Sequence, residues 1–351
     1  MSSSGPPMLL GMFLVLPMAE GGAQAFLVLA AFAGAAAASG PALSFLYGRR
    51  VTMTHVVQEC AVSFLVLAPA YLVLLAMLLL LVKEPGFTPF TVTAMGIGFL
   101  LSILLTVGLG IPIARAVRLL TPPSDRLQSL VQHAAESTGQ PVPKVRSLQW
   151  HQANAFAFPF AQMIAFTRAA EDRLSDSEIN AVAAHELAHL SEPFSARLIR
   201  LSGVLVIFPV FTIPVLIREY GMAGILIPLG WMLIGTRLLQ AFARRMETRA
   251  DEIAQQHGKD ERELARALEK IYRYNMVPAV TRSKGHTHPH LYDRMVTAGL
   301  EPDFPRPKPP GMLLTVICLM ILFASALALS LFANGEKLPL PLRFLKTDDR
   351  A

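Results

Sequence analysis

Long apolar runs alternate with polar regions along this chain. A helix needs about 20 mostly apolar residues to cross the hydrocarbon core of a bilayer. Runs near that length predict six transmembrane helices, at residues 23–47, 60–82, 91–113, 201–217, 222–239 and 312–332. The shorter apolar piece at residues 8–18 is either an interfacial segment or the outer end of the first span.

The order of these runs predicts five parts. Residues 218–221 are too few to hold a domain, so the runs on either side of them form a transmembrane hairpin. The predicted fold is an α-helical membrane protein of about six transmembrane helices with a small α+β catalytic domain. The parts are an N-terminal membrane region (1–114), a first catalytic part (115–200), the hairpin (201–240), a second catalytic part (241–310), and a last span with its tail (311–351).

The polar regions have their own periodicity. Residues 124–136 have apolar positions at helical spacing, and short apolar stretches at 144–150, 153–158 and 163–167 predict strands. Ser175 followed three residues later by Glu178 is a capping box, which predicts the start of a helix. Further on, the helix of the run 222–239 is expected to continue to about residue 256, and another is expected at 260–274.

Composition supports a membrane protein. Charged residues make up 16% of the chain and hydrophobic residues 53%, whereas a soluble protein has about 25% charged residues. The two cysteines, Cys60 and Cys318, exclude a disulfide framework and a thiolate zinc site. No basic run is interleaved with aromatic residues, so nucleic-acid binding is not expected. The net charge of +6 is instead attributed to the basic residues that set the orientation in the membrane and to attraction to anionic lipid.

The basic residues predict the orientation. Arginines follow the first span at 49–50, the third at 115 and 118, and the fifth at 244, 245 and 249. Because loops rich in Lys and Arg stay in the cytoplasm, the polar regions are expected there. The protein is therefore expected to be a multi-pass integral membrane protein, of the inner membrane if it is bacterial, with its active site facing the cytoplasm.

The chemistry begins with His185, Glu186 and His189, which form the pattern H-E-x-x-H within a helical run. Residues four apart lie on one helix face, so both imidazoles are able to bind one metal ion. Glu186 then lies beside the site as the candidate general base for an attacking water.

A second pattern supplies the remaining candidates. Glu247 and Asp251 are also four apart, in the sequence E-x-x-A-D. Two histidines and one carboxylate leave zinc an open fourth position, as in hydrolytic sites, and Asp251 is placed to accept the second N–H of a ligating histidine. Taken alone, this stretch also fits a solvated helix end with ion pairs to its arginines.

Together these patterns resemble the integral-membrane gluzincin metalloendopeptidases, which include HtpX-like heat-shock proteases and CAAX prenyl endopeptidases. The similarity extends over about residues 124–294. It also rests on the stretch Asn154-Ala155-Phe156-Ala157, on the lead-in from Phe166 to Glu178, and on His288-Pro289 with Arg294.

The resemblance implies a zincin-like catalytic domain and one Zn²⁺ per chain, held by His185, His189 and Glu247. Glu186 would be the general base, and His288 or Arg294 would stabilise the oxyanion. The edge strand of Asn154, Ala155, Phe156 and Ala157 would bind a peptide or protein substrate by strand addition. Such a protease would act on membrane-associated or unfolded proteins.

Two other functions stay open. One is a regulatory membrane protease that cuts a single signalling or prenylated substrate. The other is a non-catalytic metal-binding membrane protein or transporter. The predicted spans hold few ionisable residues of the kind that mark transport paths, which disfavours a transporter.

Overall fold

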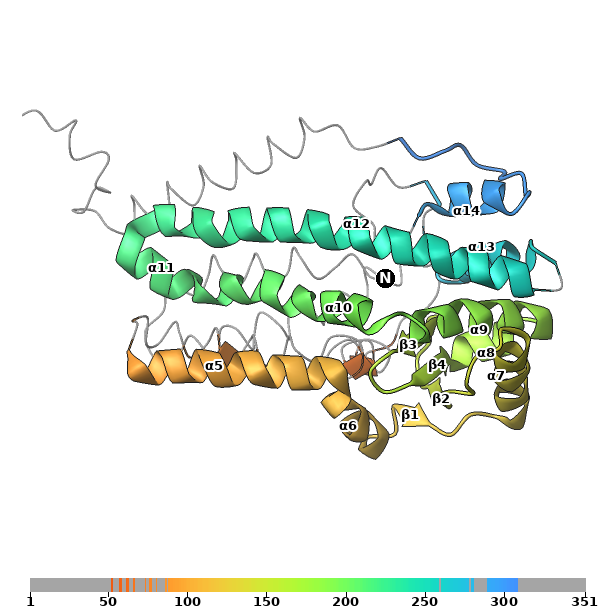
Figure 1. The fold of residues 1–351 in the computed structure, drawn as a ribbon, viewed down its shortest axis with the longest axis horizontal. Helices are drawn as coiled ribbons and strands as arrows, with labels where there is room; N and C mark the ends of the chain where they lie inside the picture. Colours follow the sequence, from red (N-terminus) through yellow and green to blue (C-terminus); the bar gives the residue numbers. More distant parts are fainter. Residues whose placement is uncertain are drawn as a thin grey trace, which may run out of the picture.

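Long helices and a small sheet domain lie end to end in this protein (Figure 1). The computed structural model describes residues 88–258, 260–277, 279–280 and 289–308, together with isolated positions between residues 52 and 86. The helices α5, α10, α11 and α12 form the elongated end of the molecule. The sheet and the helices α7, α8 and α9 form the other.

The sheet has four strands in the order β1-β2-β4-β3. They are β1 (Leu120–Thr121), β2 (Lys144–Leu148), β3 (Ala155–Phe158) and β4 (Met163–Thr167). β2 and β4 are parallel, whereas β1 pairs with β2 and β3 with β4 in antiparallel fashion. The three predicted strands are confirmed; β1 was not predicted, because two residues have no periodicity. β3 lies at an edge of the sheet, with β4 as its only strand neighbour in the described part of the chain.

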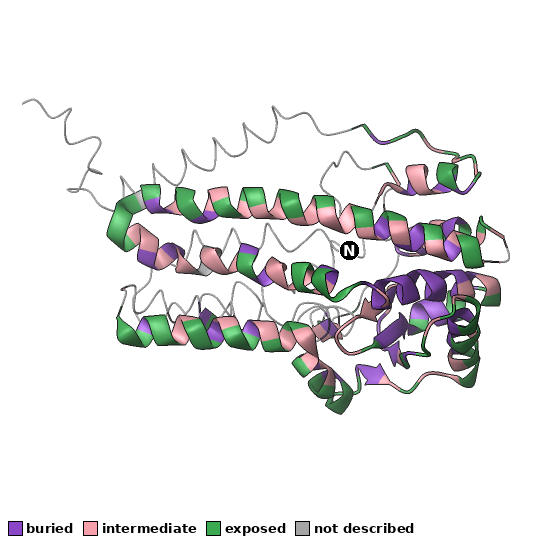
Figure 2. Cartoon of the chain, viewed as in Figure 1, coloured by how far each residue is buried: buried purple, intermediate pink, exposed green. Residues whose placement is uncertain are grey.

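Two helices bury one face of the sheet. They are α7 (Asp125–Ser137) and α9 (Asp176–Leu190), and a short helix α8 (Arg168–Arg173) connects β4 to α9. Leu127, Val131, Phe166, Ile179 and Leu187 are almost fully buried in the core between them. Figure 2 shows the buried residues gathered in this end of the molecule. The predicted amphipathic helix is thus confirmed, with Ser124 as its N-cap.

The predicted capping box at the start of α9 is confirmed. The Ser175 hydroxyl accepts a hydrogen bond from the Glu178 amide, and the Glu178 carboxylate accepts one from the Ser175 amide. Lys270 of α13 (Glu263–Tyr274) contacts the same carboxylate at 2.7 Å. Burial opposes ionisation of Glu178, but these hydrogen bonds outweigh it and hold its pKa below the usual value. The N-terminus of α9 is therefore tied to α13.

Two helical segments in the described part of the chain are long and apolar enough to cross a membrane. Pro89–Ala116 has a mean hydropathy of 2.3 and Ala223–His257 has one of 1.5. The first comprises α5 (Pro89–Leu104), a π turn and α6 (Gly110–Ala116); the second contains α12 (Leu226–His257). These agree with the expected spans 91–113 and 222–239. Large apolar side chains such as Ile97, Trp231 and Leu238 are exposed on them, as a lipid-facing surface requires.

The expected span 201–217 is not one continuous helix. The structure has α10 (Phe194–Ile207), a 3₁₀ turn (Phe208–Thr212) and α11 (Ile213–Tyr220). Pro209 and Pro214 lie at this interruption, where a proline cannot donate the backbone hydrogen bond of a continuing helix. The segment nevertheless runs back alongside α12 in Figure 1. Six spans are therefore not confirmed; residues 8–18, 23–47 and 312–332 lie outside the described residues, as does most of 60–82.

Candidate metal centre

The helix α9 presents two histidine rings from one face, one turn apart. His185 and His189 are both buried, and their ring planes are nearly perpendicular, at 87°. The two Nε2 atoms lie 3.3 Å apart. The i, i+4 spacing on a helix produces this convergence directly.

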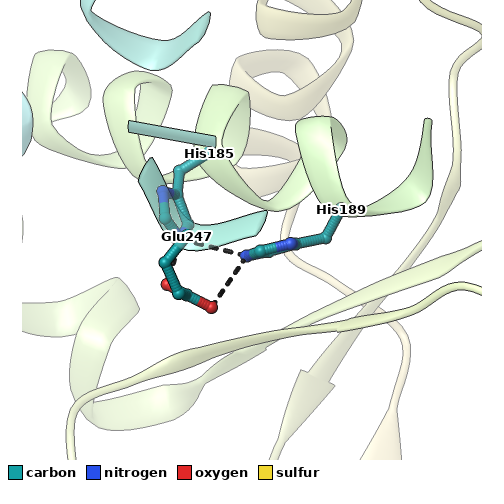
Figure 3. Close-up of side chains that lie close together, drawn as sticks. All are labelled: His185, His189 and Glu247. Atoms are coloured by element: carbon teal, nitrogen blue, oxygen red, sulfur yellow. Dashed lines mark hydrogen bonds and ion pairs between the residues drawn. The ribbon is translucent and has the colours of Figure 1, made fainter. Parts of the chain in front are cut away.

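Glu247 completes the cluster from α12, which packs along α9. Its Oε2 lies 3.5 Å from Nε2 of His185, and its Oε1 lies 3.4 Å from Nε2 of His189. Figure 3 shows the three side chains pointing at one common position. All three residues are buried.

The separations between these atoms fit one metal ion. For tetrahedral coordination with ligand distances of about 2.05 Å, neighbouring ligand atoms lie about 3.3 Å apart. The Nε2–Nε2 separation of 3.3 Å agrees with that geometry, and each Nε2 lies 3.4 or 3.5 Å from one of the two Glu247 oxygens. Two imidazoles and one carboxylate are also the donor set that hydrolytic zinc sites use. The predicted ligands are thus brought together by the fold.

A carboxylate and an arginine lie behind His185. Its Nδ1 is 2.9 Å from Oδ1 of Asp251, as expected from the E-x-x-A-D pattern. Arg294, on α14 (Leu291–Thr297), donates to the same carboxylate oxygen. Asp251 is therefore held between a ligand ring and a guanidinium.

A second carboxylate and arginine lie behind His189, and the sequence analysis missed both. Nδ1 of His189 lies 2.9 Å from Oε1 of Glu192, and Arg200 donates to both oxygens of that carboxylate. Burial opposes the charged form of His189, but its contacts with Glu192 and Glu247 outweigh burial and raise the pKa of His189 to about 9. Arg200 and His189 likewise outweigh burial and lower the pKa of Glu192 to about 2. The available signal was the spacing of Glu192, three residues beyond His189.

The domain that carries this cluster matches a known family. A sequence profile described as peptidase family M48 matches residues 123–299, which is half of the chain. The chain belongs to peptidase family M48. The resemblance to a metallopeptidase family drawn from the motifs is thereby confirmed.

One relative of this M48 protein is the protease HtpX homolog of Ralstonia pickettii (strain 12J). It is 29% identical over 187 residues. The match covers 48% of this chain and 62% of that protein, so the similarity is to part of the relative's length.

Glu186 lies within the M48 site, on the buried side of α9. Among the described residues, the cluster able to hold a metal consists of His185, His189 and Glu247, without Glu186. A buried carboxylate beside the ligands that is not itself a ligand is suited to proton transfer.

The edge strand β3 packs against α9. Ala155 and Ala157 contact the core that includes α9, whereas Phe156 and Phe158 contact the opposite cluster, with Trp150 stacked on Phe156 at 5.9 Å. The backbone edge of β3 away from β4 has no strand partner among the described residues.

Several contacts hold the chain just before β3. The Asn154 amide donates to Thr167 Oγ1 at 2.9 Å, and its own Oδ1 accepts from the Ala155 amide. Asn275, at the end of α13, forms two hydrogen bonds with the backbone of Ala153, of 2.8 and 2.7 Å. The strand is thus anchored to β4 and α13. The remaining candidate, His288, lies outside the described residues.

Proposed function

We propose that this protein is a membrane-embedded zinc metalloendopeptidase that hydrolyses peptide bonds of membrane-associated or unfolded proteins. The observation that carries the proposal is the triangle of His185 Nε2, His189 Nε2 and Glu247 oxygens, with sides of 3.3 to 3.5 Å, inside an M48 domain. Its spacing and donor set match a tetrahedral zinc site with one open position.

The residues would divide the reaction between them. Zinc held by the three side chains would polarise the scissile carbonyl and lower the pKa of water toward about 7. Glu186 would accept a proton from the attacking water and pass it to the leaving amine. Arg294 and His288 are the proposed donors to the developing oxyanion, although the contact of Arg294 with Asp251 equally supports a role in orienting His185.

The strand β3 would hold the substrate. Its outer edge offers backbone N–H and C=O groups, and an extended peptide is able to pair with them as a further strand. The short side chains of Ala155 and Ala157 lie toward α9, which supports a substrate path close to the metal cluster. Binding through the backbone would demand little sequence specificity.

The helix α12 supports action close to a membrane. It carries both an apolar stretch able to cross a bilayer and the candidate ligand Glu247. Glu247 is eight residues beyond Leu239, the end of the apolar run, which is about 12 Å along a helix. The cluster would then lie just outside the hydrocarbon core, on the cytoplasmic side if the arginine pattern sets the orientation.

The test is cleavage of an unfolded, casein-like protein by detergent-purified protein, with Glu186→Gln as the comparison. That variant should keep zinc and the fold but lose about 10²–10⁴-fold in rate. His185→Ala should instead lose the zinc. Equal cleavage by wild type and Glu186→Gln would refute the mechanism.

The breadth of substrates separates general proteolysis from cleavage of one signalling or prenylated substrate. The cleaved termini of the whole proteome should be compared between cells with wild-type protein and cells with Glu186→Gln. Many lost termini would support quality control of membrane proteins. A single lost site would support the regulatory alternative. Stoichiometric zinc with no lost termini would support a non-catalytic metal-binding protein.

A further inference from the structure

The chain passes from α9 to α10 directly after the second histidine of α9. The helix ends at Leu190, Pro193 begins the entry to α10, and Glu192 between them is 2% exposed. Its carboxylate is turned toward His189, with Oε1 at 2.9 Å from Nδ1. Because Nε2 of that ring faces Glu247, Nδ1 is the nitrogen left to donate a proton to Glu192.

Arginines of α10 fix the position of this carboxylate. Arg200 donates to both oxygens of Glu192, with Nε at 2.7 Å from Oε2, and its Nη2 also lies 3.2 Å from Nδ1 of His189. Arg197 donates to the backbone carbonyls of Glu192 and Leu190, at 3.0 and 2.7 Å. A two-pronged arginine contact sets the plane of a carboxylate as well as its charge. Glu192 is therefore held rigidly, through both its side chain and its backbone.

We infer that Glu192, held by Arg200, is a positioning residue for His189. The inference rests on the proposed zinc site. The Glu192 carboxylate fixes the orientation of the His189 ring so that Nε2 faces the metal, and Arg200 holds that carboxylate in place. The site then has two matched supports: Asp251 with Arg294 behind His185, and Glu192 with Arg200 behind His189.

The arrangement also connects the metal cluster to the membrane region. Arg200 lies on α10, the first helix of the predicted hairpin, whereas Asp251 and Glu247 lie on α12, its second helix. Each helix of the hairpin thus contributes a charged side chain to the support of the histidines. The E-x-x-A-D pattern does not include Glu192, so its contact with His189 is seen only in the folded structure.

The experiment compares two buried carboxylates: Glu192, just beyond the C-terminus of α9, and Glu178, in the first turn of α9. Glu192→Gln keeps the size of the side chain but removes its charge, and should weaken zinc binding about 10–100-fold. Glu178→Gln is the matched control, since Glu178 is also buried, also paired with a basic residue, and lies at the other end of α9. Zinc affinity is measured on detergent-purified, metal-stripped protein by competition with a chromophoric chelator.

A second set of variants covers the outcome that Glu192→Gln folds poorly. The double variant Glu192→Gln/Arg200→Gln leaves no unpaired buried charge, and should bind zinc no more tightly than Glu192→Gln alone, because the carboxylate that orients the ring is missing from both. In the cobalt(II)-substituted protein, the visible bands should shift in both Glu192 variants and stay unchanged in Glu178→Gln. A shift in the ligand field reports the orientation of the ring, which loss of global stability would not alter.

The results separate the two claims. Wild-type zinc affinity in the Glu192 variants would overturn the inference while leaving the zinc site intact. An equal loss in Glu178→Gln would also overturn it, because the effect would then follow from general destabilisation. Failure of the wild-type protein to bind zinc would refute the proposed function, and this inference with it.

Discussion

Asn275 is expected to anchor the edge strand, and its replacement by alanine gives a quantitative test. The side chain closes two hydrogen bonds on Ala153, accepting from its amide at 2.8 Å and donating to its carbonyl at 2.7 Å. Asn275 is 8% exposed and Ala153 is fully buried. Asn275→Ala therefore removes the side-chain partners of the buried N–H and C=O of Ala153.

The expected loss of stability follows from these two groups. A buried polar group left without its partner costs about 1–3 kcal/mol, so Asn275→Ala should lower the free energy of unfolding by about 2–6 kcal/mol. The effect should extend to function, because Ala153 lies two residues before β3. A loosened strand should raise KM for an unfolded substrate more than it lowers kcat.

The assay is chemical unfolding in detergent, followed by peptide cleavage under conditions where the variant remains folded. Asn180→Ala is the matched control, because Oδ1 of Asn180 is buried with no hydrogen-bond partner, so that acceptor loses no bond. A loss below about 1 kcal/mol in Asn275→Ala would contradict the reasoning from stranded backbone groups. So would an equal loss in Asn180→Ala.

Three further predictions concern the second ligand support, the helix cap and the orientation. Asp251→Asn should cost about 10–100-fold in zinc affinity or activity, with partial rescue by added zinc that Glu186→Gln does not show; full activity without rescue would contradict the role of Asp251. Because the folded-state pKa of Glu178 is lowered from 4.5, its ion pair stabilises the fold above that pH and the contribution is lost as pH falls through the folded pKa. The difference in free energy of unfolding between wild type and Glu178→Gln should therefore shrink as pH falls below about 4.5, and a constant difference would refute the assignment. Finally, Ser129→Cys on the exposed face of α7 tests the orientation, in a protein whose Cys60 and Cys318 are replaced by serine. The new thiol should resist a membrane-impermeant thiol reagent in intact cells, and ready labelling of it would reverse the predicted orientation.

The amino-acid sequence alone predicted the local elements of the catalytic domain. The helix with His185 and His189, its capping box at Ser175 and Glu178, and three of the four strands all depend on side chains a few residues apart. Interactions over such short separations leave a periodic signature, which is why these elements could be read without a structure. The cluster of His185, His189 and Glu247 was also predicted, because two i, i+4 pairs and a family resemblance pointed to the same site.

The tertiary structure decided what depends on packing between distant segments. Asn275 binds a backbone 122 positions away, a contact that no local pattern encodes. The contact between Glu192 and Arg200 joins the residues after α9 to α10, and the apolar composition of residues 201–217 did not reveal the break at Pro209 and Pro214. Helices and their caps are stabilised by local interactions. The partners of a buried polar group instead depend on how whole helices pack against one another, which only the folded chain specifies.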